Sequence, residues 1–322
     1  MAHAESGCRK FGENGRFEIG PVVILWRIHL SSQFWTNHNR QVFVINNVLH
    51  CRNDETSGLL VVEFRRLTRS HSQLRSFIRL FQSDGRRDDD QSFLLSNAFN
   101  EPQRVLSRTF FDNSLRGMLQ TPAQAVDHCF ADDITSQLFK PAGQRLGFDL
   151  ISLNIQRGRD HGLPPYVWML CYLTGNYLQM SLPFTFDQLV TRLPLEVVSA
   201  MKNVYAHPRD IHLFVGGVSE KPLPKAVLGP TFASIFALQV VDLRRADRFF
   251  YSSNVGIDPN SLSRNQFDEI QKESLAKIIC DNSDGTITNI QPKAFRVPDN
   301  LLNKPVPCGN LPGIDFTKLL PL

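Results

Sequence analysis

Hydrophobic residues recur at helical spacing over most of the chain beyond residue 71. From Ser72 to Phe81, the apolar residues Leu74, Phe77 and Ile78 fall three to four positions apart and predict a first helix. The charged stretch that follows, residues 83–91, predicts a solvated loop. Ser107–Leu119 predicts a second helix, which ends at Thr121 because proline disfavours helical backbone at the residue before it.

The same spacing continues into the second half of the chain. It predicts an amphipathic helix, two short helices, a buried helix and a long capped helix over residues 125–139, 184–193, 194–205, 229–243 and 261–279. The alternation typical of strands is scarce, so we predict a mainly α protein with little β structure. Residues 1–60 show no clean period and form an unrecognised N-terminal segment, whereas residues 61–322 form the helical domain.

Composition and charge exclude several classes of partner. The 322 residues carry a net charge of +4, with lysine and arginine spread along the chain, so no nucleic-acid partner is expected. No apolar run is long enough to predict a membrane span. The N-terminus lacks the basic and then apolar layout of a secretory signal.

The chain has six cysteines, none of them in a CxxC pair, which argues against a zinc site. Cys280 follows a helical run and Cys308 lies in a proline-rich stretch, so we predict a disulfide between them. Such a bond indicates folding in an oxidising compartment, and the alternative is a pair of unbonded thiols.

The chemistry-bearing residues concentrate in one short run, which reads Asn154-Ile155-Gln156-Arg157-Gly158-Arg159-Asp160-His161-Gly162 and follows an apolar stretch ending at Leu153. His71 lies 83 residues before Asn154, in the sequence Arg69-Ser70-His71-Ser72. We expect Arg159 and Asp160 to brace their own loop by local pairing. His71 is either a metal ligand or an ordinary structural residue.

These segments resemble the animal haem peroxidase family of the myeloperoxidase and peroxidasin type. Further blocks extend the resemblance over residues 64–316, namely 209–220 with its Gly-Gly-Val-Ser-Glu element, 243–251 and 278–282. The resemblance implies that this chain contains the C-terminal, proximal-haem part of the catalytic domain. It also implies an extracellular, secreted protein that oxidises a halide, phenol or tyrosyl group with hydrogen peroxide.

The resemblance assigns roles to five residues. His71 would be the axial ligand of the iron of a b-type haem, bonding through Nε2. Asn154 would accept a hydrogen bond from the other ring nitrogen and so fix the tautomer. Arg157 would pair with a haem propionate, and Leu150 and Leu153 would line the proximal face of the haem.

The sequence departs from the family on the distal side. Residues 1–63 contain neither the distal histidine, in a Gln-(x)2-Asp-His-Asp element, nor the distal arginine, in an Arg-(x)2-Glu element. The family's calcium-binding loop is not found either. Thr68 replaces the arginine expected before the proximal histidine, and Ser234 replaces the cysteine that would pair with Cys171. No catalytic residue is therefore identifiable.

Three hypotheses follow from these observations. The chain is a haem peroxidase, a catalytically incomplete haem-binding or interaction protein, or a helical domain in which the motif is only structural. Haem binding separates the third hypothesis from the other two, and peroxide turnover separates the first from the second.

Overall fold

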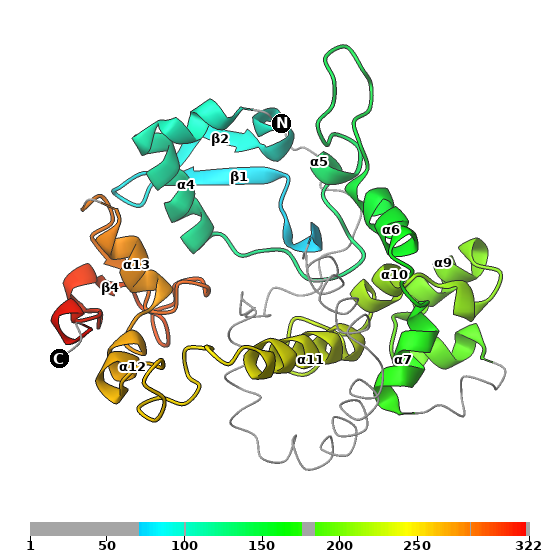
Figure 1. Cartoon of the computed structure of the whole chain (residues 1–322). Helices are drawn as coiled ribbons and strands as arrows, with labels where there is room; N and C mark the ends of the chain where they lie inside the picture. The colour runs from blue at the N-terminus through cyan, green and yellow to red at the C-terminus, as the bar shows by residue number, and fades with distance from the viewer. Residues whose placement is uncertain (1–70, 100, 176–183, 284, 320–322) are drawn as a thin grey trace. The chain divides into compact units, whose positions relative to one another are not determined.

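The computed structural model describes residues 71–99, 101–175, 184–283 and 285–319, which are mostly helical as predicted (Figure 1). The chain divides into two compact units, each made from two separate stretches of sequence. Unit 1 contains the chain up to Ser76 and Ala123–Val241, and unit 2 contains Phe77–Pro122 and the chain from Asp242 onward. The segment 1–60 lies outside the described residues, so the boundary near residue 60 stays a prediction.

Unit 1 is an assembly of short helices around one apolar core. Its most buried side chains include Tyr166, Leu189, Leu193 and Ile211, none of which exposes any surface to solvent. The elements are η1 (His71–Gln73), α5 (Asp132–Thr135), α6 (Leu150–Asp160), α7 (Tyr166–Thr174), η4 (Phe186–Thr191), α9 (Leu195–Val204), η5 (Pro208–Asp210), α10 (Leu213–Val218) and most of α11 (Pro230–Ala246).

Two adjacent glycines of α10 allow aromatic rings to pack directly against its backbone. A Cβ atom at Gly216 would lie 2.1 Å from the ring of Tyr166, and one at Gly217 would lie 2.1 Å from the ring of Phe232. No side chain fits at either position. The Gly-Gly pair in the sequence therefore reflects the close approach of α7 and α11 to α10.

Glu220 places a buried carboxylate in this part of the core, next to Tyr166 and Thr231. Its Oε1 accepts hydrogen bonds of 2.7 Å from the hydroxyls of Tyr166 and Thr231, and its Oε2 accepts a third, also of 2.7 Å, from the backbone nitrogen of Thr231. Only 4% of Glu220 is exposed. Burial raises the pKa of this carboxyl above its usual value despite the three donors.

Unit 2 combines a β-hairpin with the remaining helices. Strands β1 (Phe77–Phe81) and β2 (Arg87–Leu94) pair antiparallel, and α4 (Arg108–Gln120) packs against β1 (Figure 1). Gly117 of α4 lies so near β1 that a Cβ atom would sit 1.8 Å from the carbonyl oxygen of Arg79. The other elements are η2 (Leu95–Ala98), η3 (Pro102–Leu106), α12 (Arg264–Ile270), α13 (Leu275–Asp281), β3 (Asn289–Ile290), β4 (Val306–Pro307), η6 (Cys308–Asn310) and η7 (Phe316–Lys318).

Four predicted elements differ from the structure. The helix expected over 72–81 is wrong, because only His71–Gln73 forms a helical turn before Phe77–Phe81 pairs as a strand with Arg87–Leu94, in the region predicted as a loop. The region 125–139 contains a single helical turn, Asp132–Thr135. The long helix over 261–279 is two helices, α12 and α13, since Ser274 caps a new helix by accepting from the backbone nitrogen of Lys277.

The remaining helix predictions are confirmed. Helix α4 spans Arg108–Gln120 and ends at the Thr121-Pro122 pair, and α11 spans Pro230–Ala246 with a largely buried face. The two short helices appear as the 3-10 helix η4 and the α-helix α9. Among the helices of the described ranges, none is both long and apolar enough to cross a membrane.

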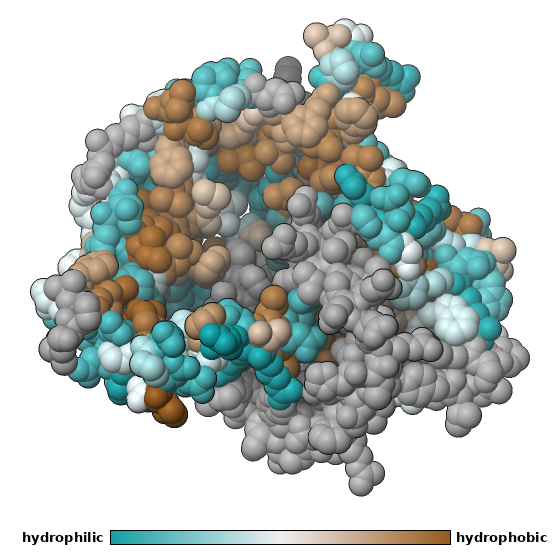
Figure 2. All heavy atoms as spheres, viewed as in Figure 1, coloured by the Kyte–Doolittle hydropathy of each residue, from teal (hydrophilic) through white to brown (hydrophobic). Residues whose placement is uncertain are grey.

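The predicted disulfide is present in unit 2. Cys280 at the end of α13 and Cys308 at the start of η6 are joined by an S–S bond of 1.99 Å, which closes a loop of 28 residues. Cys171 is buried in unit 1 as a free thiol. Both units also leave large apolar side chains at the surface (Figure 2), including Phe148 and Leu153 in unit 1 and Phe249 in unit 2.

Candidate functional site

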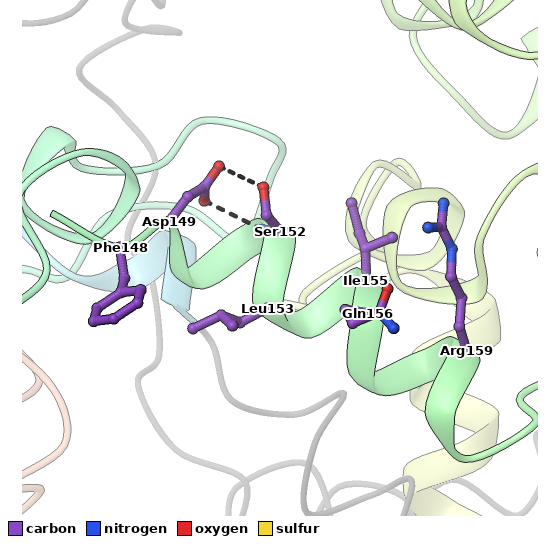
Figure 3. A pocket seen from close by; sticks show the side chains of 7 residues that line it. All are labelled: Phe148, Asp149, Ser152, Leu153, Ile155, Gln156 and Arg159. Atoms are coloured by element: carbon purple, nitrogen blue, oxygen red, sulfur yellow. Dashed lines mark hydrogen bonds between the residues drawn. The ribbon is translucent and has the colours of Figure 1, made fainter. Parts of the chain in front are cut away.

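The residues 150–160 of the predicted motif form helix α6, which Asp149 begins. Its Oδ1 accepts from the backbone nitrogens of Ile151 at 2.8 Å and Ser152 at 3.2 Å, and its Oδ2 accepts from the Ser152 hydroxyl at 2.7 Å (Figure 3). This N-cap satisfies backbone donors that have no partner inside the helix. With the helix fixed in this way, Asn154 and Arg157 are three residues apart and project from neighbouring turns.

His71 lies in a short turn that is tied to residues 124–127. The backbone nitrogen of Gln124 donates to the carbonyl oxygen of Gln73 at 3.1 Å, and that of Asp127 donates to the hydroxyl of Ser72 at 3.3 Å. Ser72 is only 1% exposed. The two residues that follow His71 are therefore held in place by hydrogen bonds within unit 1.

The side chains of His71 and Asn154 meet. The amide nitrogen Nδ2 of Asn154 lies 2.9 Å from the ring nitrogen Nδ1 of His71. In this orientation the amide donates, which corresponds to an imidazole that carries its proton on Nε2. A half-turn of the amide exchanges its nitrogen with its oxygen and reverses the direction of the hydrogen bond.

The other predicted residues line one pocket of about 520 Å³ in unit 1. Leu150, Leu153, Asn154 and Arg157 contribute to its wall from α6, and Leu163, Pro165, Asp210, His212, Leu213 and Phe214 complete it together with other residues of α6 and its C-terminal end. Leu150 is half-buried and Leu153 is 44% exposed. Of the five predicted residues, four therefore share this pocket and the fifth, His71, contacts one of them.

A second hollow, of about 560 Å³, runs along a neighbouring flank of α6 (Figure 3). Phe148, Asp149, Ser152 and Gln156 line it, together with Leu153, Ile155 and Arg159, which also line the first pocket. None of the residues of α6 is fully buried. The helix therefore has solvent-accessible space along much of its length.

Arg157 is exposed at the wall of the first pocket. If Arg157 had a purely structural role, it would be expected to form an ion pair with a nearby acidic residue. No acidic residue within the described ranges forms a salt bridge with it.

A chain of polar contacts at the pocket wall was not predicted from the sequence. Nε of Arg159 donates to Nε2 of His212 at 3.0 Å, and the hydroxyl of Tyr205 lies 2.9 Å from Nδ1 of His212. The expected local pairing is therefore wrong for Arg159, whose partner lies 53 residues away. Asp160 does have a local neighbour, since its Oδ2 lies 3.8 Å from Nε2 of His161.

The residues at this pocket suit a haem group. Its wall offers apolar side chains for a flat hydrophobic ring, and the Arg157 guanidinium matches a carboxylate in the two-bond fork that such pairs form. The imidazole of His71 contacts Asn154 through Nδ1. A half-turn of the amide would let Nδ1 donate to Asn154, which is the arrangement typical of histidines that bind metals through Nε2. His71 is the imidazole that such a group could use as a ligand.

Known proteins resemble this chain in both sequence and structure. The sequence model of the family described as animal haem peroxidase matches residues 34–295. Among curated relatives, a chorion peroxidase of Drosophila melanogaster is 34% identical over 252 residues, which cover 76% of this chain and 29% of that protein. Heme peroxidase 2 of Caenorhabditis elegans is 34% identical over 259 residues, covering 78% of this chain and 34% of the relative.

Solved structures agree with these sequence matches. Peroxidase A of Dictyostelium discoideum superposes with a TM-score of 0.60 at 25% identity, covering 73% of this chain and 42% of the other. A fatty acid alpha-dioxygenase of Arabidopsis thaliana superposes with a TM-score of 0.58 at 18% identity, which is a likeness of fold alone. The chain spans about a third of the length of these two curated relatives.

Proposed function

The chain belongs to the animal haem peroxidase family, and from that premise we propose that it binds a b-type haem through His71. The observation that carries this proposal is the 2.9 Å contact between Asn154 and Nδ1 of His71, beside a pocket lined by Leu150, Leu153 and Arg157. Bound haem would supply the redox chemistry by which hydrogen peroxide is reduced and a halide, phenol or tyrosyl donor is oxidised.

The protein's own residues have distinct parts in this proposal. Ligation through Nε2 requires its lone pair, so the proton of the His71 ring must then reside on Nδ1. The Nδ1–H group must then donate a hydrogen bond to Oδ1 of Asn154, and haem binding therefore selects the amide orientation opposite to the one described above. A hydrogen bond from Nδ1–H of His71 to Asn154 makes the imidazole a stronger base at Nε2 and fixes the plane of its ring.

Arg157 and the two leucines position the haem. The guanidinium would anchor one propionate at the pocket wall through a two-bond fork. Leu150 and Leu153 would cover the apolar ring surface, and their present exposure would then fall. No residue of this chain is assigned to proton transfer on the peroxide side.

A second candidate function is a haem-binding or interaction protein without turnover. It is favoured by the lack, in residues 1–63, of the distal histidine and arginine elements. Such groups move the peroxide proton and stabilise developing charge, and water is a poor substitute for them. The two candidates share the proximal site and differ only in peroxide chemistry.

We place the protein in an oxidising, extracellular setting. The Cys280–Cys308 disulfide supports this proposal, because such bonds persist in secreted proteins and are rare in reducing compartments.

A haem titration tests the site. The purified chain is titrated with ferric haem and followed at the Soret band, beside the variants His71→Ala and His161→Ala. We expect a histidine-type spectrum in the wild type and in His161→Ala, and its loss in His71→Ala. Equal loss in both variants would contradict the assignment of His71. Oxidation of a phenol by peroxide in the haem-loaded chain then distinguishes the two candidate functions.

A further inference from the structure

His212 joins three helices of unit 1 through its two ring nitrogens. It is the N-cap residue of α10, and it meets Arg159 from the last turn of α6 and Tyr205, the C-cap residue of α9. We call the three side chains the His212 clasp. Arg159 and His212 also line the pocket that contains Asn154 and Arg157.

The chemistry of the clasp fixes the protonation state of His212. A guanidinium has only donors, so Nε2 of His212 must accept the hydrogen bond from Nε of Arg159. The ring proton is then on Nδ1 and is donated to the hydroxyl oxygen of Tyr205. A second proton, on Nε2, would point at the N–H of Arg159 and place two positive charges in contact.

The neighbouring groups do not offset that repulsion. Helix α10 itself, Leu213–Val218, has no titratable side chain. Burial, followed by the charge of Arg159, lowers the pKa of His212 below its usual value, and burial raises the pKa of Tyr205.

The guanidinium of Arg209, in η5, lies over the ring of Trp168 on α7 at 5.5 Å. The carboxylate of Asp210, also in η5, accepts through its Oδ2 from the backbone nitrogen of His207 at 3.1 Å.

The attachment of helix α6 to the rest of unit 1 relies on polar contacts such as the one between Arg159 and His212. None of its residues is fully buried, and only Ile151 and Ile155 pack partly against the core of the unit. We propose that the His212 clasp is an acid-sensitive latch, which fastens the C-terminal half of α6 to the α9–α10 connection at neutral pH and releases it when His212 takes up a proton. Release would loosen the pocket wall that presents Arg157.

Hydrogen exchange at residues 156–161 tests the latch without any ligand. We expect their amide protection, corrected for intrinsic rates, to fall roughly tenfold between pH 7.5 and 5.0 in the wild type, while α7 stays protected. His212→Gln should show no such fall, because a neutral amide can accept from Arg159 at both pH values. The matched control is His207→Gln, a neighbouring histidine outside the clasp, which should behave as the wild type does.

Nitrogen NMR of the imidazole rings provides a second test, because it reports which ring nitrogen carries the proton. We expect His212 to carry its proton on Nδ1 at pH 7.5, and Arg159→Gln to raise its pKa towards that of a free histidine. A proton on Nε2, unchanged protection of α6 in the wild type, or an equal fall in His212→Gln would each overturn the proposal.

The consequence for haem rests on the proposed function. If haem binds, its affinity should drop more steeply between pH 7.5 and 5.5 in the wild type than in His212→Gln, and an equal drop in both would contradict this consequence. Failure of every form to bind haem would count against the proposed function alone, since the exchange and NMR measurements decide the latch without haem.

Discussion

Nδ2 of Asn154 lies 2.9 Å from Nδ1 of His71, although 83 residues separate them in the chain. The contact joins α6 to the short turn at His71–Gln73 within unit 1. It ties the Nδ1 side of the His71 ring to α6. The orientation of the proposed axial ligand is thus determined by the fold.

Removing this amide should weaken haem binding without abolishing it. We expect Asn154→Ala to lower haem affinity about 10- to 100-fold, because the groups that orient a metal-binding histidine typically contribute that much. Asn154→Asp, which keeps an acceptor, should retain most of the affinity. Soret titrations of the three proteins measure the effect, and an affinity in Asn154→Ala equal to the wild type would contradict the role of the amide.

The buried carboxyl of Glu220 should make stability depend on pH. Its pKa is raised by burial, so the native state binds this proton more tightly than the unfolded chain does. The resulting stabilisation is complete below the unfolded pKa and is lost as the pH rises through the higher native value. We therefore expect the wild type to lose free energy of unfolding, relative to Glu220→Gln, as the pH rises from about 4.3.

Urea unfolding at a series of pH values measures this difference. Glu196→Gln serves as the control because Glu196 is an exposed glutamate of the same unit. A pH dependence that is the same in Glu220→Gln and in the control would show that Glu220 does not titrate as proposed.

Two glycines in helices should respond in opposite directions to the same substitution. Gly117→Ala would place a Cβ atom 1.8 Å from the backbone oxygen of Arg79, so α4 must shift away from β1. We expect a loss of about 1–3 kcal/mol or more in the free energy of unfolding. Gly158→Ala meets only a side-chain carbon of Leu163 at 3.6 Å and should be neutral or stabilising, by up to about 1 kcal/mol. Thermal unfolding followed by circular dichroism compares them, and equal losses would contradict the packing argument.

The Cys280–Cys308 bond should contribute substantially to unit 2. Its loop of 28 residues corresponds, by the entropy of the unfolded chain, to about 3–4 kcal/mol. We expect the double variant Cys280→Ser with Cys308→Ser to lose stability of that order under non-reducing conditions. Cys171→Ser, which removes a free thiol, is the control for loss of a buried sulfur. If the double variant is as stable as the wild type, the bond does not constrain the unfolded chain.

The sequence predicted the helices whose apolar face repeats over several turns. Ser107–Leu119 and Gly229–Leu243 contain enough residues to distinguish a helical period, and α4 and α11 occupy these positions. Phe77–Phe81 contains only five residues, and such a run fits a strand as well as a helix. Its partner, Arg87–Leu94, is strongly charged, and the backbone pairing that decides the outcome is a tertiary event.

Some residues of the candidate site were predicted from the sequence and others were not. His71, Asn154 and Arg157 were predicted through the family's spacing, and the structure brings the first two into contact and places Arg157 on the pocket wall with Asn154. The pairing of Arg159 with His212 was missed, because nothing in either local sequence indicates that residues 53 apart will meet. Periodicity describes one element at a time, whereas this clasp depends on how three helices pack.

The division of each unit between two stretches of sequence has a consequence for biogenesis. Unit 1 needs residues as late as Val241, and unit 2 begins at Phe77 but needs the chain beyond Asp242. During synthesis, the hairpin β1–β2 and helix α4 therefore leave the ribosome long before α12 and α13, with which they share a unit. Contacts of such high sequence separation form slowly and leave apolar surface uncovered in the meantime. The nascent hairpin and α4 should thus rely on chaperones until the chain beyond Asp242 has been made.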